Sequence, residues 1–243
     1  MLKKSSNPVL NEKSFQKAAA SLSDTNVMTV KGTIQKTMVM TILVFISAMW
    51  SWSNPSNMWM LVGGIGGLIT GLITVFKPNA APISAPIYAV LEGLFLGGIS
   101  LLISSQYGMG GIVIQAITLT IGVLFLMLFL YASGIIKVTD KLRMGIAAAT
   151  GAVFLMYMIN WVMSFFGAAF FTLADTSLMA IGINLVVVGI AAFNLLLDFD
   201  FIDRAAASRA PKAMEWYGAF GLMVTLIWLY IELLKLLSRL NRR

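Results

Sequence analysis

The sequence predicts an all-α membrane protein with seven transmembrane helices. Of its 243 residues, 59% are apolar and only 11% are charged, whereas a soluble domain carries about 25% charged residues. The apolar residues form long uninterrupted runs and not the short alternating strands of a membrane β-barrel. The composition therefore argues against a soluble enzyme, and the apolar fraction excludes a disordered chain.

Seven segments are apolar over about 20 residues, the length that crosses a bilayer as a helix. They lie at 37–53, 58–76, 84–103, 112–134, 145–167, 178–200 and roughly 214–237. Residues 1–36 are expected to form a cytoplasmic polar tail, and 37–243 the seven-helix transmembrane domain. Because the first segment follows this polar tail, we expect an anchored helix and not a cleaved signal peptide.

Glycines mark the second and third segments. Gly63, Gly67 and Gly71 are spaced four residues apart in the second segment, and Gly93 and Gly97 repeat this spacing in the third. Such spacing lets the backbones of neighbouring helices approach closely. Packing within the chain is the simpler interpretation, and a dimer interface is the alternative.

Basic residues alternate from one loop to the next. The tail and the loops after the second, fourth and sixth segments hold 13 Lys and Arg residues, and the other three loops hold none. The positive-inside rule then places the N-terminus in the cytoplasm, and cations at the membrane edges argue against nucleic-acid binding. Further basic residues follow the last segment, which either crosses the membrane, as its length slightly favours, or enters and returns. They are Lys235, Arg239, Arg242 and Arg243.

The chain contains neither cysteine nor histidine. Disulfides, thiolate zinc sites and histidine-dependent catalysis are therefore excluded, and we expect no enzyme activity and no cofactor. Any pH response must come from carboxyl or lysine groups, and acids at membrane depth are the candidates because a charge there is costly. These are Glu92 in the third segment, Asp198 and Asp200 near the end of the sixth, and Glu232 in the seventh, with Lys235 three residues on.

Two of these acids lie in segments that resemble a known family. The stretches LLLDFDFI at the end of the sixth segment and LYIELLKLL in the seventh are similar to the two acidic signatures of the Bax-inhibitor family, the transmembrane Bax inhibitor motif proteins. The NPVL stretch near the start and AVLEGLFLGGIS in the third segment resemble the bacterial YccA-like branch of that family. The resemblance covers nearly the whole chain in layout, although its motifs are short.

The resemblance implies a bundle of six helices around a central seventh in the bacterial inner membrane. It also implies a pH-sensitive calcium leak, gated by a carboxyl pair between helices six and seven. On the motif match, this pair is Asp198 and Glu232, although the family usually has Asp at the second position. A basic residue at the end of the second helix supports the pair in some members, and Lys77 occupies that place.

Two carboxyl groups close together at low dielectric cannot both ionise cheaply, so they share one proton. The shared proton would bridge helices six and seven. Its loss would leave two repelling charges that attract a divalent cation, and oxygen ligands suit calcium. Asp198 and Glu232 are thus also the expected calcium contacts, with calcium as the permeant ion.

Helix lengths count against this pairing. If the last segment is helical from its start, Glu232 stands about 28 Å above that start, whereas Asp198 is at most about 17 Å above the preceding turn. The two levels match only if 211–221 lies partly in the membrane interface. Otherwise the partner of Asp198 is Glu215 or a residue of another helix, with Asp200 and Glu215 as a shallower alternative pair.

A non-conducting regulator, such as a modulator of a membrane protease, is the main alternative function, because the resemblance implies that role for some relatives. An intramembrane aspartyl protease would need a GxGD motif, and a retinal protein would carry its lysine nearer mid-helix. Only the glycine-rich second segment suggests a secondary transporter. The expected partners are the lipid bilayer, calcium ions and, for a regulator, a membrane protease or another membrane protein.

The charge pattern yields a test of topology. Single cysteines that replace Ser56, Gly108 or Thr176 should react with an impermeant thiol reagent added from the periplasmic side. Cysteines at Thr139 and Ala207 should not react, because their loops carry the cytoplasmic basic residues. Reaction of the Thr139 cysteine from outside would reverse the predicted orientation, and labelling at the C-terminal end determines whether the last segment crosses.

Overall fold

The computed structural model describes residues 27–106, 111–168 and 175–242, and these ranges fold almost entirely into helices. The described helices are α2 (Val30–Ser53), α3 (Asn57–Phe76), the short 3-10 helix η2 (Pro78–Ala80), α4 (Ala81–Gln106), α5 (Ile112–Ala132), α6 (Asp140–Ser164), α7 (Leu178–Ala207) and α8 (Met214–Asn241). All seven α-helices are long and apolar enough to cross a membrane, which confirms the predicted fold class and the order of the seven segments.

Hydroxyl side chains set the starts of four helices. Thr29, Ser56, Thr139 and Ser177 occupy the N-cap positions of α2, α3, α6 and α7, and each accepts a hydrogen bond from a backbone N–H of the first turn. Such caps satisfy donors that the helix itself cannot pair. The cap at Thr29 makes α2 begin seven residues before the predicted start at 37, within the segment that the sequence indicated as tail.

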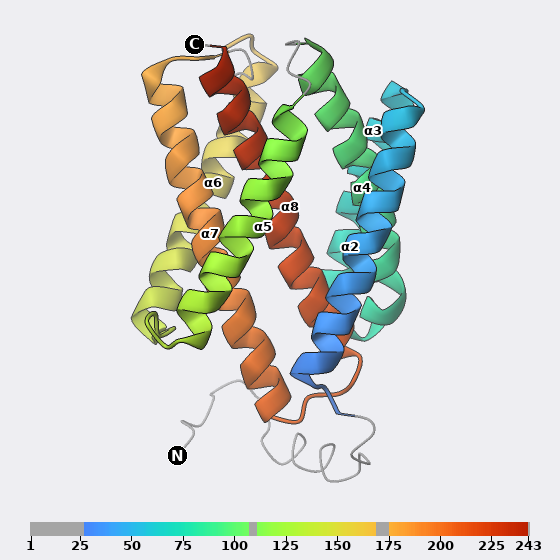
Figure 1. Cartoon of the computed structure of the whole chain (residues 1–243), viewed down its shortest axis with the longest axis vertical. Coiled ribbons are helices and arrows are strands. Elements are labelled where there is room, and N and C mark those ends of the chain that lie inside the picture. Colours follow the sequence, from blue (N-terminus) through green and yellow to red (C-terminus); the bar gives the residue numbers. More distant parts are fainter. Residues whose placement is uncertain (1–26, 107–110, 169–174, 243) are drawn as a thin grey trace.

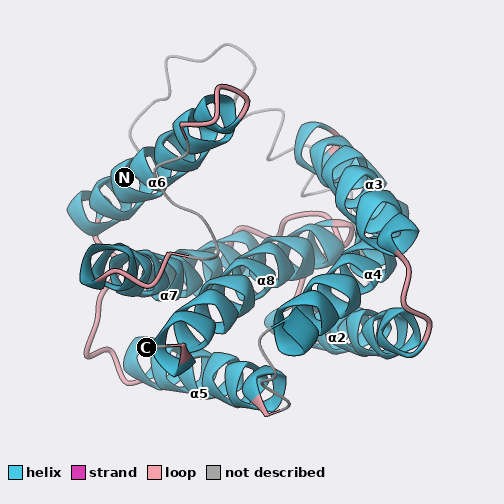
Figure 2. Ribbon diagram, turned by 90° about the horizontal axis from the view of Figure 1, so that it is seen from above, coloured by secondary structure: helices cyan, strands magenta, loops and turns pink. Residues whose placement is uncertain are grey.

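Helix α8 occupies the centre of the bundle (Figure 2). It packs against α2, α4, α5 and α7, whereas α3 packs mainly on α4, and α6 mainly on α7. Half of the most apolar stretch of α8 is buried, against 11% for α6. The helix is continuous from one end of the bundle to the other (Figure 1), as a full crossing by the last segment requires.

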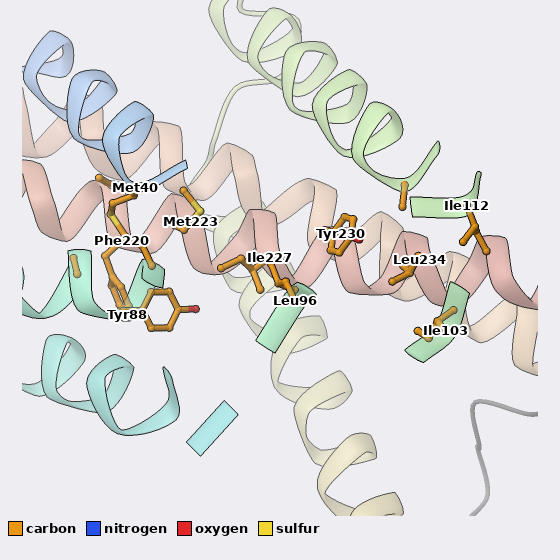
Figure 3. Close-up of a cluster of buried hydrophobic side chains, with 14 residues drawn as sticks. Met40, Tyr88, Leu96, Ile103, Ile112, Phe220, Met223, Ile227, Tyr230 and Leu234 are labelled. Carbon is orange, nitrogen blue, oxygen red and sulfur yellow. The ribbon is translucent and has the colours of Figure 1, made fainter. Parts of the chain in front are cut away.

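Apolar residues cover two faces of α8, so the helix is apolar nearly all round, as a buried helix must be. One face meets α2, α4 and the first turns of α5 through residues spaced three or four apart, and Figure 3 shows them lined up along the helix. The other face meets α5 and α7. The first face consists of Ala219, Phe220, Met223, Ile227, Tyr230 and Leu234, and the second of Leu222, Leu229 and Leu233.

Glycines allow α2, α3 and α4 to pack at close range. A Cβ at Gly63 of α3 would lie 2.5 Å from the carbonyl oxygen of Leu91 in α4, and one at Gly97 of α4 would overlap the carbonyl oxygen of Ala48 in α2. Lipid tails are as apolar as these helix faces, so close packing and polar contacts hold the helices together. The spaced glycines of α3 and α4 therefore serve the packing of helices within the chain.

The glycine contacts yield a stability prediction. Gly97→Ala should lower the free energy of unfolding by about 1–3 kcal/mol, because the added methyl group forces two backbones apart. Gly151→Ala in α6 is the matched control, since nothing lies within 4 Å of its Cβ position; it should be neutral or stabilising by about 0.5–1 kcal/mol. Chemical unfolding in detergent micelles measures both, and an equal effect of the two substitutions would contradict the packing role.

Candidate functional site

A pocket of about 560 Å³ lies between α3, α4, α7 and α8. Its titratable side chains are Tyr88 and Glu92 from α4, Asp198 from α7 and Tyr217 from α8. No Lys or Arg is among the described residues that line it, and the other lining residues are apolar except Thr225. The pocket therefore combines two acids with apolar walls and without a basic partner.

Asp198 reaches the pocket from the apolar run that ends α7. Its carboxyl group contacts Thr225 of α8, and a Cβ at Gly221 would lie 3.8 Å from its Oδ1. Its Oδ2 atom is buried and has no hydrogen-bond partner. A buried polar atom in that condition is unusual and calls for a ligand, a proton or a water as partner.

Glu92 reaches the same pocket from the middle of α4. It lies against Gly67 of α3, where an added Cβ would come 2.5 Å from Glu92 Oε1. The absence of a side chain on α3 thus makes the room for this carboxyl group. Glu92 and Asp198 lie on different walls of one pocket, because Glu92 contacts α3 and Asp198 contacts α8.

Glu232 lies outside this pocket, in a polar network between α6, α7 and α8. Only 1% of the residue is exposed. Tyr157 donates a 2.9 Å hydrogen bond to its Oε1 atom, Lys235 forms a 2.8 Å ion pair with the same atom, and Asn184 donates a 2.8 Å hydrogen bond to Oε2. Arg239 in turn donates to Asn184 Oδ1 at 3.0 Å. The carboxylate of Glu232 is therefore neutralised and fully hydrogen-bonded.

The structure does not bring Asp198 and Glu232 together, and the predicted proton-sharing pair is corrected accordingly. Helix α8 is regular from Met214 onward, so the mismatch in helix lengths that the sequence indicated is real. Asp198 lies level with Thr225, which precedes Glu232 by seven residues, or about 10 Å along the helix axis. The second acid in the surroundings of Asp198 comes from another helix and is Glu92.

Glu215 and Asp200 also have separate partners. Glu215 is fully buried; its Oε2 lies 2.9 Å from Lys36 Nζ, and its Oε1 accepts hydrogen bonds from the backbone N–H and the hydroxyl of Thr29. Asp200 pairs with Arg143 at 3.0 Å and with Arg204 at 2.8 Å. These contacts fasten α2 to α8 and α6 to α7.

Lys77 takes no part in the Asp198 pocket. It ends α3 and is exposed, in a separate shallow pocket formed by residues 76–80. Sequence reasoning also missed Tyr157, Asn184 and Thr225, which contact the intramembrane acids. The available signal was Asn184, an amide in an otherwise apolar run that begins at Leu178.

The different surroundings of Glu232 and Asp198 yield a prediction about stability. Glu232→Gln should lower the free energy of unfolding by about 1–3 kcal/mol, because it leaves Lys235 without its anion. Asp198→Asn should cost little, because it removes a charge that has no basic partner. Chemical unfolding in detergent micelles tests both variants. A larger loss in Asp198→Asn than in Glu232→Gln would contradict these assignments.

A family model described as Bax inhibitor 1 like matches residues 7–242. No curated protein matches the sequence. The matched range contains all seven helices, both walls of the acidic pocket and the Glu232 network. The pocket and the central last helix are thus features of a chain that belongs to the Bax inhibitor 1 like family.

Proposed function

We propose that this protein is a pH-sensitive, calcium-permeable leak of the bacterial inner membrane, in the YccA-like branch and with its N-terminus in the cytoplasm. The observation that supports this function best is the pocket that Glu92 and Asp198 line without any described basic residue. A cavity with two acids and no base attracts cations and repels anions. The basic residues, which lie in the N-terminal tail and in every second loop, support this orientation.

Calcium suits the groups that this pocket offers. Calcium binds oxygen ligands in a flexible geometry, and the pocket supplies the carboxylates of Glu92 and Asp198 and the hydroxyl groups of Tyr88, Tyr217 and Thr225. A leak needs a site that holds the ion only briefly. Two carboxylates on separate walls meet that need better than a closed cage of ligands.

The pH response arises from the cost of charge in the pocket. An ionised carboxylate without a basic partner is costly in apolar surroundings, so Glu92 and Asp198 exchange a proton for a cation. With the proton bound, the pocket is neutral and α7 stays packed on α8 through the contact of Asp198 with Thr225. Loss of the proton leaves a charge that favours water and a divalent cation, and calcium flux therefore rises with pH.

In this proposal Glu232 holds the helices and does not sense pH. Its charge is already balanced by Lys235 and hydrogen-bonded by Tyr157 and Asn184. Glu92 takes the place that the motif match gave to Glu232 as the second acid. The carboxyl pair of the family resemblance thus becomes a pair of acids in one pocket, on α4 and α7.

Calcium entry into proteoliposomes between about pH 6 and pH 8 tests the function. The wild-type protein should show a flux that increases with pH, whereas Asp198→Asn and Glu92→Gln should lose most of this response, because an amide cannot release a proton. Asp203→Asn is the control, since Asp203 is exposed and contacts Tyr131 outside the pocket. Its pH response should match the wild type.

The other possible outcomes of the flux experiment each point to a different mechanism. A full pH response in both Asp198→Asn and Glu92→Gln would remove the pocket acids from the mechanism. Loss of the response in Glu232→Gln alone, with the variant folded, would restore the role that the motif match assigned to Glu232. No flux at any pH in the wild-type protein would overturn the leak and favour the non-conducting regulator.

A further inference from the structure

The acidic pocket opens on an apolar surface. Four of its lining residues are also strongly exposed, and all four are aliphatic. They are Leu68, Leu72 and Val75 of α3 and Val224 of α8, with exposures between 38% and 65%. In a helix bundle long enough to cross a membrane, such an exposed aliphatic surface faces lipid tails. This side of the pocket is therefore open to the hydrocarbon.

The lining of the pocket is suited to a positive charge. Glu92 and Asp198 provide carboxyl groups, and the buried Oδ2 atom of Asp198 has no partner. The rings of Tyr88 and Phe220 stand edge to face with their centroids 4.9 Å apart, and Figure 3 shows the two side chains next to each other. Aromatic faces attract ammonium groups, and both rings line the pocket together with Glu92 and Asp198.

We infer that this pocket binds a lipophilic primary ammonium ion, an alkylamine-like amphiphile that enters from the lipid phase. The ammonium group donates hydrogen bonds to the carboxylates of Asp198 and Glu92, and the alkyl chain lies along Leu68 and Leu72 out to the hydrocarbon. A volume of about 560 Å³ falls within the range of about 300–1,000 Å³ that is usual for small-molecule sites. The inference concerns a ligand and does not depend on calcium conduction.

The same features exclude other amphiphiles. A phospholipid with an ethanolamine head also carries an ammonium group, but its phosphate would lie beside two acids with no described Lys or Arg in the lining to balance it. A neutral long-chain alcohol matches the apolar mouth but offers no charge to the carboxylates. The pocket therefore selects for a cation without an attached anion, on a chain that is soluble in lipid.

Photolabelling identifies the site directly. The full chain in nanodiscs, without calcium, is illuminated with a dodecylamine that carries a diazirine in its chain, and the labelled peptides are identified by mass spectrometry. Label should appear in α3 and in the first half of α8. An excess of unlabelled dodecylamine should reduce it at least fivefold, whereas dodecanol and added phosphatidylethanolamine should not.

Substitutions separate the charge from the cavity. Asp198→Asn combined with Glu92→Gln should reduce the labelling at least fivefold, and Asp203→Asn should leave it unchanged. Gly71→Val narrows the pocket without altering charge, since a Cβ at Gly71 would meet the ring of Tyr88 at 3.5 Å, an ordinary contact. It should reduce labelling as well, and its folding is checked by chemical unfolding.

Four results would overturn the inference. The first is labelling that dodecanol reduces as much as dodecylamine does, and the second is labelling that persists in the variant with both carboxyl groups replaced. The third is labelling spread evenly over the lipid-facing helices, and the fourth is competition by phosphatidylethanolamine, which would identify a lipid head group as the occupant instead. The labelling assay contains no calcium, so a negative labelling result does not contradict the proposed calcium leak. Likewise, the labelling assay can be carried out even if the protein conducts no calcium.

Discussion

The bundle depends on balancing charges that lie on a helix surrounded by other helices. A buried carboxylate is costly unless a cation and hydrogen-bond donors reach it. Helix α8 carries two such acids, Glu215 in its first turn and Glu232 in its second half. Lys36 and Thr29 of the α2 region reach Glu215, and Tyr157 of α6 and Asn184 of α7 join Lys235 at Glu232. These contacts fix where the central helix sits along its axis.

The acidic pocket is the place where this balance is left incomplete. Asp198 and Glu92 face a cavity with no described basic residue in its lining, although Lys36 and Lys235 neutralise the two buried acids of α8. The fold pairs its other buried acids with bases but leaves these two without one, so ionising them in the pocket costs free energy. Acids in such surroundings are typical of functional sites. The same exception therefore supports both the proposed ion path and the proposed ammonium site.

Much of the fold follows from sequence because the length and hydrophobicity of a membrane helix are local properties. The seven segments and the intramembrane acids were predicted in this way. The motif match predicted a pairing of Asp198 with Glu232 that the structure does not contain, because the level of each acid depends on how one helix is placed along another. The rise per residue of an α-helix had indicated that the two acids lie at different levels. Asp198 and Glu92, 106 positions apart, line one pocket because of how α3, α4, α7 and α8 are arranged, which periodicity alone does not reveal.

The central position of α8 also has a consequence for how the protein is made. Synthesis proceeds from the N-terminus, so the helix that touches α2, α4, α5 and α7 leaves the ribosome after the other six described transmembrane helices. Until it inserts, α2, α4, α5 and α7 lack the helix that contacts all four of them, and Lys36 and Asn184 lack the acids that they later contact. Among the described helices, the assembly of the bundle therefore depends on the insertion of α8 between helices that are already in the membrane.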